Sequence, residues 1–567
     1  MEPGTLFFCV PGERVDGHEF GAAAAAAGAA ALVVERELEV DLPQVVVADA
    51  RAAMAPLAAR FFGDPTAELR VAGITGTNGK TTTAFLLREI LEAAGVRCGL
   101  LGTVKQIVGG ADEGVERTTP EAIELQRTFR RMRDGGDAAC AMEVSSHALA
   151  LHRADAIHFD VALFTNLTQD HLDFHADMED YFRAKRLLFE MEPRTAIVNV
   201  DDPYGRRLAE EFDCVTFSAA GAEADLVATD VVLKPTAAEF TVHSGPTGRK
   251  PTHVVGNRPV GGDLRVATRL VGGFNLANAL GALAAAIAMG VDPEAAAGGL
   301  AQAAPPPGRF EPIDEGQPFA VLVDYAHTPD SLDNVLRAAR RLGEGRVISV
   351  FGAGGDRDRG KRPLMGRAGA ELSDLAIVTS DNPRSEDPEA IVGEVAAGAE
   401  GGGELELEVD RRAAIARAFA AADAGDTVVI AGKGHEQGQE FEHGRKIPFD
   451  DRDVAREELR RLLDGSPPAA RLGMNLTAEQ IAAAIGAEVV SRGAPGSPRR
   501  GVIDSGEAGE GDLFVGLRGE RVDGGEFAPA ALVAGAWGAV VGSAAARSSF
   551  APDSDANLDH AREDGWV

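Results

Sequence analysis

The segment Gly73-Ile74-Thr75-Gly76-Thr77-Asn78-Gly79-Lys80-Thr81-Thr82-Thr83 is the stretch that decides the fold of this chain. An alternating apolar run leads into it, which predicts a strand. Apolar residues then recur on one helical face up to Ala94, and Gly95 suits the end of that helix. A strand, a glycine-rich loop and a helix in this order form the context of a phosphate-binding loop. The consensus spacing G-x-x-x-x-G-K-[ST] departs at one position, where Ile74 replaces glycine.

Each residue type in this loop suits the binding of a polyphosphate. The glycines let backbone N–H groups turn toward the anion, and the start of the following helix favours negative charge. Lys80 adds a positive charge, and the hydroxyl of Thr81 can reach a magnesium ion. The segment therefore predicts that the chain binds ATP.

The composition is that of a globular protein and excludes several classes of partner. With 56 Lys and Arg against 88 Asp and Glu, the net charge of −32 argues against general binding to nucleic acid or to anionic membranes. The four cysteines are scattered without a C-x-x-C pair, which predicts a reduced, cytoplasmic compartment. The apolar run at residues 21–34 is short and rich in alanine, so we expect a buried helix followed by a strand and no membrane insertion.

One internal repeat divides the chain. Residues 4–20 recur with few changes at residues 511–527, and an alanine-rich helical pattern followed by an Ala-Val-Val strand pattern comes after each copy. The same small α/β module therefore begins the chain and begins again near its end. This arrangement indicates two related proteins joined head to tail.

Between the two copies, apolar runs that read as strands alternate with helical patterns. Most of these runs end in polar residues: 140–143, 161–166, 197–201, 321–324, 347–352, 377–381 and 428–432. Buried parallel strands read as continuous apolar runs, and their ligands gather at the carboxyl ends. We therefore predict two α/β domains with mostly parallel sheets, which meet near residues 304–308.

Two polar clusters follow the phosphate loop at such strand ends. Residues 142–147 bring the carboxylate of Glu143, and residues 165–173 bring Asn166, Asp170 and His171. Oxygen and nitrogen ligands beside a phosphate loop are what a magnesium–ATP site requires. The two clusters together therefore predict such a site.

The chain resembles the Mur ligase family of ATP-dependent amino-acid ligases, and residues 1 to about 463 are similar to its MurE type. The resemblance lies in ten ordered motifs: 75–81, 142–147, 165–175, 181–185, 274–275, 308–311, 324–329, 355–358, 381–384 and 432–436. It implies an α/β fold with a uridine-binding module, a central ATP-binding domain and a C-terminal Rossmann-like domain. The expected divisions are an N-terminal module at 1–66, a central domain at 67–305, a C-terminal domain at 306–463, a linker at 464–473, a second module at 474–550 and a disordered tail at 551–567.

The resemblance also implies a reaction. A MurE-type enzyme adds meso-diaminopimelate to UDP-N-acetylmuramoyl-L-Ala-D-Glu through an acyl phosphate, as a step of peptidoglycan precursor synthesis. It implies ATP, Mg²⁺ and a carbamylated lysine, and we expect a monomer that binds no nucleic acid. The catalytic residues implied are Lys80, Glu143, His171 and Lys185, and the implied metal ligands are Thr81, Glu143, His171 and the carbamate of Lys185.

Three binding sets follow from the same matches. The ATP-binding set is Gly76, Thr77, Asn78, Gly79, Lys80, Thr81, Thr82, Asn275, Arg309, Asp324 and His327. The set for the UDP-linked substrate is Thr118, Thr119, Ser145 and Arg153. The set for diaminopimelate is Arg357, Asp381, Asn382, Pro383, Arg384, Gly432 and Glu436. In this last set Arg384 offers a planar fork for the distal carboxylate, and Glu436 suits the distal ammonium.

The chain departs from the family pattern at the start of its first module and in its second module. Family members begin some twenty residues earlier with an Asp-Ser-Arg element that helps to hold the uridine, so we expect the first module to be truncated at its start. The second copy carries Asp504-Ser505-Gly506 at that place and resembles the first domain of the MurF type, but no second phosphate loop follows it. The chain is therefore expected to be a truncated bifunctional fusion.

Two alternatives stay open. One is another ligase of the superfamily, such as a lysine-adding relative or a folylpolyglutamate synthetase, against which the motif at residues 4–20 and the Asn-Pro-Arg triplet argue. The other is an inactive nucleotide-binding scaffold. The presence of Lys80, Glu143, His171 and Lys185 together argues against that loss of activity.

Overall fold

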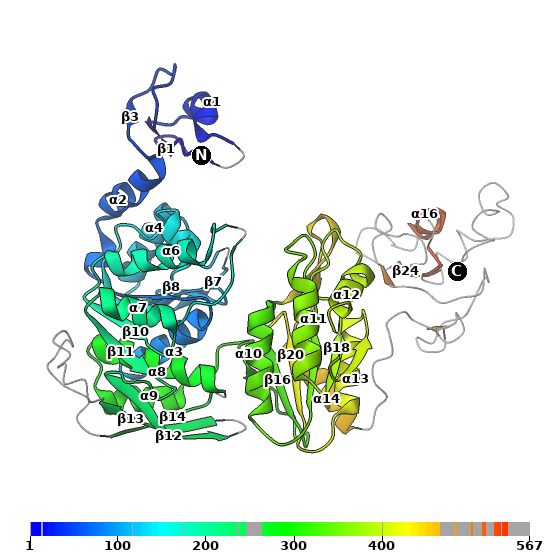
Figure 1. Ribbon diagram of the computed structural model, residues 1–567. Coiled ribbons are helices and arrows are strands. Elements are labelled where there is room, and N and C mark those ends of the chain that lie inside the picture. The colour runs from blue at the N-terminus through cyan, green and yellow to red at the C-terminus, as the bar shows by residue number, and fades with distance from the viewer. Residues whose placement is uncertain are drawn as a thin grey trace. The chain divides into compact units, whose positions relative to one another are not determined.

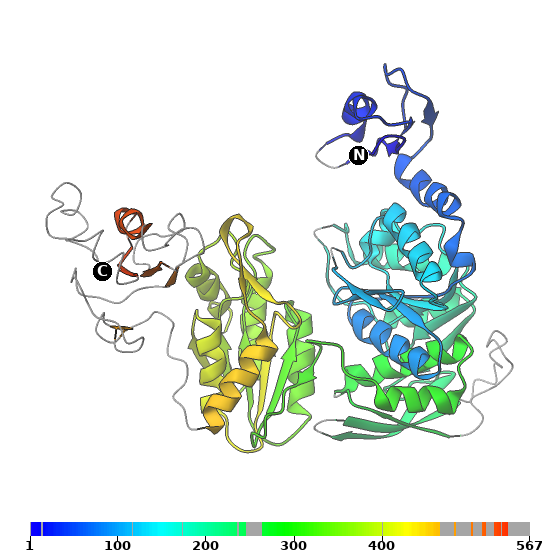
Figure 2. The ribbon, with the colours of Figure 1, turned by 180° about the vertical axis from the view of Figure 1, so that it is seen from behind.

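The computed structural model describes most of the chain up to residue 464 and short segments beyond it (Figures 1 and 2). The described residues are 2–12, 15–115, 117–172, 174–234, 237–244, 263–270, 272–399, 401–464, 481–482, 501–502, 513–516, 527–534 and 536–541. They divide into two compact units, Met1–Val409 with Ala418–Glu457 and Asp410–Arg417 with Glu458–Val567. Helices α13 (Arg411–Ala421) and α14 (Asp451–Leu463) each run from one unit into the other.

The first unit begins with a small module around a three-stranded parallel sheet. The strands β1 (Leu6–Phe8), β2 (Ala31–Val34) and β3 (Gln44–Val46) pair in chain order. Helix α1 (Gly21–Ala26) and β2 confirm the predicted helix and strand, but α1 buries only Gly21 and Ala24 and is otherwise largely exposed. Helix α2 (Ala50–Phe62) leads to the next sheet. Asp49 caps α2 by accepting the N–H groups of Arg51 and Ala52.

An eleven-stranded sheet forms the next part, in the order β14-β13-β12-β11-β10-β9-β4-β8-β5-β6-β7. Its centre is parallel, as predicted, and antiparallel hairpins extend both edges. The strands are β4 (Arg70–Thr75), β5 (Cys98–Leu101), β6 (Gln106–Val108), β7 (Ala111–Glu113), β8 (Ala139–Glu143), β9 (Phe159–Phe164), β10 (Thr195–Asn199), β11 (Cys214–Ser218), β12 (Leu226–Lys234), β13 (Ala237–Ser244) and β14 (Leu264–Thr268).

Helices cover both faces of this sheet (Figure 1). One face packs against α3 (Lys80–Ala93), α8 (Gly273–Ala288) and α9 (Pro293–Gln302). The other face packs against α4 (Ala122–Asp134), α5 (Ser146–Ala150), α6 (Met178–Glu190) and α7 (Pro203–Glu211). Within β4, Val71 packs into one core while Ala72 and Ile74 pack into the other, which explains why the strand is apolar on both sides.

The C-terminal sheet has six strands in the order β15-β16-β20-β17-β18-β19, and all but β15 run parallel. The strands are β15 (Glu311–Pro312), β16 (Ala320–Asp324), β17 (Val347–Phe351), β18 (Leu375–Val378), β19 (Glu404–Leu407) and β20 (Thr427–Ala431). The helices α10 (Pro329–Arg340), α11 (Lys361–Leu372) and α12 (Pro388–Ala396) share a core with them, and a hairpin of β21 (Gly438–Glu440) and β22 (Lys446–Pro448) follows. The α/β fold class predicted from the sequence is therefore confirmed.

The described part of the second repeat copy has the strand, helix and strand that begin the first. Strands β23 (Gly501–Val502), β24 (Leu513–Val515) and β25 (Gly538–Val540) form a parallel sheet, with α16 (Ala528–Val533) between the last two. Here β24, α16 and β25 correspond to β1, α1 and β2. The predicted tail at residues 551–567 and all but the first residue of the predicted linker lie outside the described residues. Among the described helices of both units, none is long and apolar enough to cross a membrane.

Candidate active site

The phosphate loop connects β4 to α3, as the opening stretch of sequence predicts. Gly76 has a φ of 147° and Gly79 a φ of 88°, which are values that residues with a side chain rarely adopt. A Cβ atom on Gly76 would lie 1.9 Å from Oγ1 of Thr165, and one on Gly79 would lie 2.2 Å from Oδ1 of Asn278. Both positions therefore require glycine, for conformation and for space.

The end of β9 holds this loop in place. The N–H group of Thr77 donates to the carbonyl of Asn166 at 2.9 Å, and that of Asn78 donates to its Oδ1 at 2.9 Å. Oγ1 of Thr165 donates to the carbonyl of Asn78 at 2.6 Å. These two loop N–H groups are therefore engaged within the protein. The donors left for a phosphate are the N–H groups around residues 79–82, where α3 begins.

Two lysines meet beneath the loop. The Nζ atoms of Lys80 and Lys185 each donate to the carbonyl oxygen of Gly76 at 2.8 Å, and Lys80 also donates to that of Thr77 at 2.8 Å. The Lys185 side chain is 1% exposed, and its burial and the Lys80 charge lower its pKa well below the usual value. Burial also lowers the pKa of Lys80, although Glu143 and Asp170 act in the opposite direction.

A tyrosine completes the surroundings of Lys185. The ammonium nitrogen lies 4.4 Å from the ring centroid of Tyr181, within range of a cation–π interaction. The hydroxyl of Tyr181 lies 3.2 Å from Oγ1 of Thr77, so one residue contacts both the loop and the lysine. Burial raises the pKa of the Tyr181 hydroxyl, which therefore stays protonated.

Glu143 ends β8 beside the start of α3. Its Oε2 accepts from Oγ1 of Thr81 at 2.9 Å and from Oγ1 of Thr103 at 3.2 Å, while its Oε1 accepts from the N–H of Thr103 at 2.7 Å. The side chain is buried, and three donors fix its orientation. A hydroxyl and a carboxylate placed together in this way are suitable oxygen ligands for Mg²⁺.

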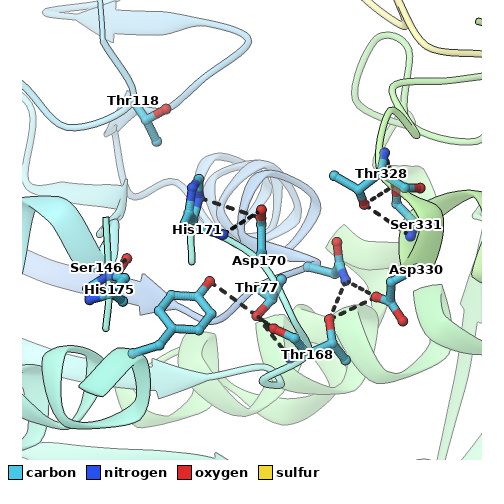
Figure 3. Close-up of polar contacts among 12 residues, drawn as sticks. Thr77, Thr118, Ser146, Thr168, Asp170, His171, His175, Thr328, Asp330 and Ser331 are labelled. Carbon is cyan, nitrogen blue, oxygen red and sulfur yellow. Dashed lines mark hydrogen bonds and ion pairs between the residues drawn. The ribbon is translucent and has the colours of Figure 1, made fainter. Parts of the chain in front are cut away.

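His171 lies in the loop after β9 with Asp170 (Figure 3). Its backbone is left-handed, with φ of 54°, and its N–H donates to Oδ1 of Asp170 at 2.9 Å. Its Nε2 lies 3.5 Å from Oδ2 of the same carboxylate. In the described part of the chain, no three His, Cys, Asp or Glu side chains gather as a ready metal cluster. A magnesium ion held here would therefore depend on substrate phosphate and water for further ligands.

Asp170 is not among the catalytic or binding residues that the resemblance implies, although it lies in the polar cluster at residues 165–173. Its negative charge raises the pKa values of Lys80 and Lys185 against the effect of their burial. An acidic residue directly before a predicted histidine ligand was the signal available in the sequence.

Three of the four residues predicted for the UDP-linked substrate gather beside Glu143. Oγ1 of Thr119 donates to the carbonyl of Glu143 at 2.9 Å and accepts from the N–H of Ser145 at 3.2 Å. Oγ1 of Thr118 lies 3.0 Å from that of Thr103. Arg153 is instead paired with Glu121, through Nη2 and Oε1 at 2.8 Å.

Asp324 ends β16 and organises the loop around Arg309. Its Oδ2 accepts from the N–H of Phe310 and its Oδ1 from the N–H of Ala326, both at 2.7 Å. Burial raises the pKa of Asp324 to about 6, although the Arg309 charge and the two donors lower it. The guanidinium of Arg309 lies 4.5 Å from the ring centroid of Tyr325, and its Nη2 lies 3.5 Å from Oγ1 of Thr81.

The other two residues of the predicted ATP set are held by their neighbours. The Nδ1–H of His327 donates to the carbonyl of Tyr325 at 2.8 Å, and burial and the Lys361 charge lower the pKa of His327. Asn275 is buried near the start of α8, where its Oδ1 accepts from Nδ2 of Asn278 at 3.1 Å.

A cavity of about 830 Å³ brings most of these residues together. The predicted residues that line it are Thr77, Asn78, Gly79, Lys80, Thr81, Thr82, Thr118, Glu143, Ser145, His171, Lys185, Arg309, Asp324 and His327. Gly76, Thr119 and Asn275 lie behind this lining, and Arg153 is not part of it.

Asp330 is a further contact of the phosphate loop that sequence reasoning missed (Figure 3). Its Oδ2 accepts from Nδ2 of Asn78 at 3.1 Å and from Oγ1 of Thr168 at 2.8 Å. Asp330 lies in the first turn of α10, which Thr328 and Ser331 close with a capping box. The motif at residues 324–329 stops one residue before it, and nothing in its local pattern distinguishes it from an ordinary acidic residue at a helix start.

The residues predicted for the amine form a separate group. A second cavity, of about 560 Å³, is lined by Asn382, Arg384 and Glu436, whereas Arg357 is exposed and Asp381, Pro383 and Gly432 lie outside the lining. Arg384 has a left-handed backbone with φ of 52°. Strained backbone of this kind persists where surrounding contacts fix it, and it is frequent at functional sites.

Three family models match the chain. The model described as "Mur ligase family, catalytic domain" matches residues 1–62, "Mur ligase middle domain" matches 74–286, and "Mur ligase, glutamate ligase domain" matches 308–434. The chain belongs to the Mur ligase family. The matched ranges all lie before residue 435, so the resemblance of the second module to the MurF type stays a prediction.

Individual Mur ligases match over most of the chain. A protein of Streptomyces coelicolor named UDP-N-acetylmuramoyl-L-alanyl-D-glutamate–2,6-diaminopimelate ligase is 48% identical and covers 81% of this chain and 91% of its own length. A protein of the same name from Geobacillus thermodenitrificans is 45% identical and covers 81% and 93%. A solved structure of a ligase with this name is 32% identical, with a TM-score of 0.59 over 82% of this chain and 93% of its own.

Proposed function

We propose that this chain is an ATP-dependent ligase that joins meso-diaminopimelate to UDP-N-acetylmuramoyl-L-Ala-D-Glu. The observation that carries the proposal is the meeting of Lys80, Thr81, Glu143 and Lys185 at one phosphate-binding loop. The names of the relatives support the identity of the two substrates.

The chemistry requires activation of a carboxylate, which is a poor electrophile. An oxygen of the D-glutamyl carboxylate attacks the γ-phosphorus of ATP, ADP leaves, and an acyl phosphate forms. The incoming amine then attacks the acyl carbon, loses a proton, and displaces inorganic phosphate as the amide bond forms. Lys80 and the N–H groups around residues 79–82 neutralise negative charge on the transferred phosphoryl group.

A magnesium ion fits the donors beside the loop. Oγ1 of Thr81 and the carboxylate of Glu143 are the protein ligands we propose, with His171 and a modified Lys185 for a second ion. When bound, magnesium neutralises charge on the phosphates.

Lys185 has the surroundings that carbamylation needs. A neutral amine is the form that reacts with carbon dioxide, and burial and the Lys80 charge lower the pKa of Lys185 well below its usual value. The product carries a carboxylate at a buried position that otherwise holds only the amine. We therefore propose that Lys185 acts as its carbamate.

The remaining assignments concern binding and organisation. We propose that the module at residues 1–66 and the group of Thr118, Thr119, Ser145 and Arg153 hold the UDP-linked substrate. The domains at 67–305 and 306–463 would hold ATP and the amine. We further propose that the chain acts as a monomer in the cytoplasm and that residues 474–550 form a MurF-like module.

Choice of the amine is assigned to Arg384. Its Nη1 donates to the carbonyl of Gly355 at 2.8 Å and its Nε to Oε2 of Glu440 at 3.0 Å, so the guanidinium is fixed on one side. Arg384 also lines the second cavity, where its remaining N–H groups can bind the distal carboxylate of diaminopimelate. L-Lysine lacks that carboxylate.

The test is release of inorganic phosphate from Mg-ATP with UDP-N-acetylmuramoyl-L-Ala-D-Glu, with meso-diaminopimelate and L-lysine compared. We expect release with diaminopimelate and little with lysine, and loss of this selectivity in Arg384→Ala. Equal use of both amines by the unmodified protein would overturn the specificity. No release of phosphate with either amine, together with ATP binding, would favour the inactive scaffold. Activity with a folate substrate would favour a folylpolyglutamate synthetase.

A further inference from the structure

Lys433 is a fully buried lysine in the turn after β20, and the function proposed above gives it no role. Its side chain is 0% exposed. The Nζ atom lies 2.8 Å from Oδ1 of Asn382, 3.1 Å from Oε2 of Glu436 and 3.5 Å from Oδ1 of Asp381. One ammonium group therefore joins three residues that the amine site is proposed to use.

The geometry excludes Lys433 as a direct contact of the amine. The Nζ atom of Lys433 bonds Asn382 and Glu436 and pairs with the carboxylate of Asp381. Lys433 is buried and does not line the second cavity. Its charge is far from water, so removing it would leave carboxylates facing one another without a counter-ion. Lys433 therefore acts through the residues that it holds.

The first of these residues is Asn382, whose amide has one permitted orientation. Its Oδ1 accepts from Lys433 and from the N–H of Glu440 at 3.0 Å, and its Nδ2 donates to Oε2 of Glu436 at 2.8 Å. If the amide were reversed, its NH₂ group would face two donors. Lys433 thus acts together with the N–H of Glu440 to fix the orientation of the Asn382 amide.

Glu436 is held by one of its two oxygens. Oε2 accepts from both Lys433 and Asn382, whereas Oε1 has no protein donor among the residues that the structure describes. The side chain is 32% exposed and lines the second cavity. Oε1 is therefore available to the ammonium group of a bound amine.

Charge balance in this group bears on the choice of amine. Within the bonded group the positive side chains are Lys433 and Arg384, and the negative ones are Asp381, Glu436 and Glu440. The cavity lining adds the positive side chains of Lys105, Lys446 and Arg452. The distal end of diaminopimelate carries an ammonium and a carboxylate, while the end of lysine carries an ammonium alone. Loss of the Lys433 charge would make the group more negative, which disfavours a carboxylate and favours a lone ammonium.

We propose that Lys433 is a positioning and specificity-determining residue, which orients Asn382 and Glu436 and balances their charge so that an amine with a distal carboxylate is preferred. This inference rests on the proposed function, because it assigns Lys433 to the same amine site.

The test compares K433M with R337M in the full-length chain. Arg337 lies on α10 in the same domain, is 57% exposed and pairs with Asp333, so R337M removes one positive charge away from the amine site. We expect K433M to raise the KM for diaminopimelate at least about tenfold, as loss of hydrogen bonds to charged groups does, with the KM for ATP unchanged. The preference for diaminopimelate over lysine in kcat/KM should fall with it, and R337M should match the unmodified protein.

A second variant tests the same charge balance by removing a negative charge, whereas K433M removes a positive one. Glu440 is 31% exposed and accepts from Nε of Arg384, so E440Q keeps an acceptor while it removes a negative charge. We expect its preference for diaminopimelate to rise. If K433M does not fold, this variant decides alone, and an unchanged or reduced preference would overturn the inference.

The remaining outcomes separate this inference from the proposed function. An unmodified protein that uses neither amine refutes the function itself. An unmodified protein that prefers diaminopimelate, with a K433M variant that keeps both the KM and the preference, refutes only the role of Lys433. A K433M variant whose parameters for ATP and both amines change in parallel also refutes it, because that pattern indicates general structural damage.

Discussion

Substitution of Gly76 by alanine tests the account of the phosphate loop most directly. The new Cβ would lie 1.9 Å from Oγ1 of Thr165 and 3.0 Å from the carbonyl oxygen of Asn166. Oγ1 of Thr165 cannot move freely, because it donates to the carbonyl of Asn78 at 2.6 Å and lies 3.3 Å from that of Thr75. The carbonyl of Gly76 itself accepts from two ammonium groups, so a shift of this residue disturbs the lysines as well.

The expected loss of stability has three parts. A side chain at positive φ costs about 1–2 kcal/mol. Overpacking adds about 1–3 kcal/mol, and each hydrogen bond that Thr165 gives up adds about 1 kcal/mol. Alanine also has less backbone freedom than glycine in the unfolded chain, which offsets up to about 1 kcal/mol of this loss. With one hydrogen bond lost, Gly76→Ala should therefore lower the free energy of unfolding of the central domain by about 2–6 kcal/mol.

Gly95→Ala is the matched control. Gly95 also has a positive φ, of 76°, but a Cβ there would meet nothing within 4 Å. Its expected loss is about 1 kcal/mol, with ATP affinity unchanged. Urea unfolding followed by far-ultraviolet circular dichroism measures stability, and calorimetric titration with ATP measures affinity, which should fall at least about tenfold in Gly76→Ala. Equal losses of stability in both variants, with ATP affinity retained, would refute the steric account.

Three further predictions concern the same cavity. Because burial raises the pKa of Asp324 to about 6, kcat/KM for ATP should fall as the pH drops through about 6. Initial rates across pH 5–8 measure this step, which Asp324→Asn should lack. Removal of dissolved carbon dioxide should lower activity and bicarbonate should restore it, whereas Lys185→Arg should be inactive and insensitive to bicarbonate. Thr81→Val should reduce kcat at least about a hundredfold, while Thr81→Ser, which keeps the hydroxyl that donates to Glu143, should stay within about tenfold of the unmodified rate.

The parts of the fold predicted best are those where local pattern and burial agree. Strand β4, the glycine-rich loop and helix α3 follow directly from the opening stretch, because each apolar residue there enters one of two cores. The placement of Glu143 beside Thr81 also follows, since the carboxyl ends of neighbouring parallel strands meet at one edge of a sheet.

The contacts missed are those that join residues far apart in sequence without a local signal. Asp330 reads as a common acidic residue at a helix start, and its bonds to Asn78 and Thr168 depend on tertiary packing. Lys433 reads as a charged residue in a turn, which is usually solvated, yet it is fully buried among the side chains of another loop. Sequence spacing cannot supply such distances.

The carbonyl of Gly76 joins the two lysines that the proposed function places in the active site. Lys80 can leave this oxygen for a phosphate, because its ammonium group has three hydrogen atoms and a flexible stem. A carbamylated Lys185 would still have one N–H, which can keep its bond to the same oxygen while the new carboxylate extends beyond it. The loop that binds ATP and the lysine proposed for modification therefore share one backbone atom. A displacement of Gly76 should for this reason reduce ATP affinity and the bicarbonate dependence of the rate together, and a variant that changed one without the other would show that the two lysines act separately.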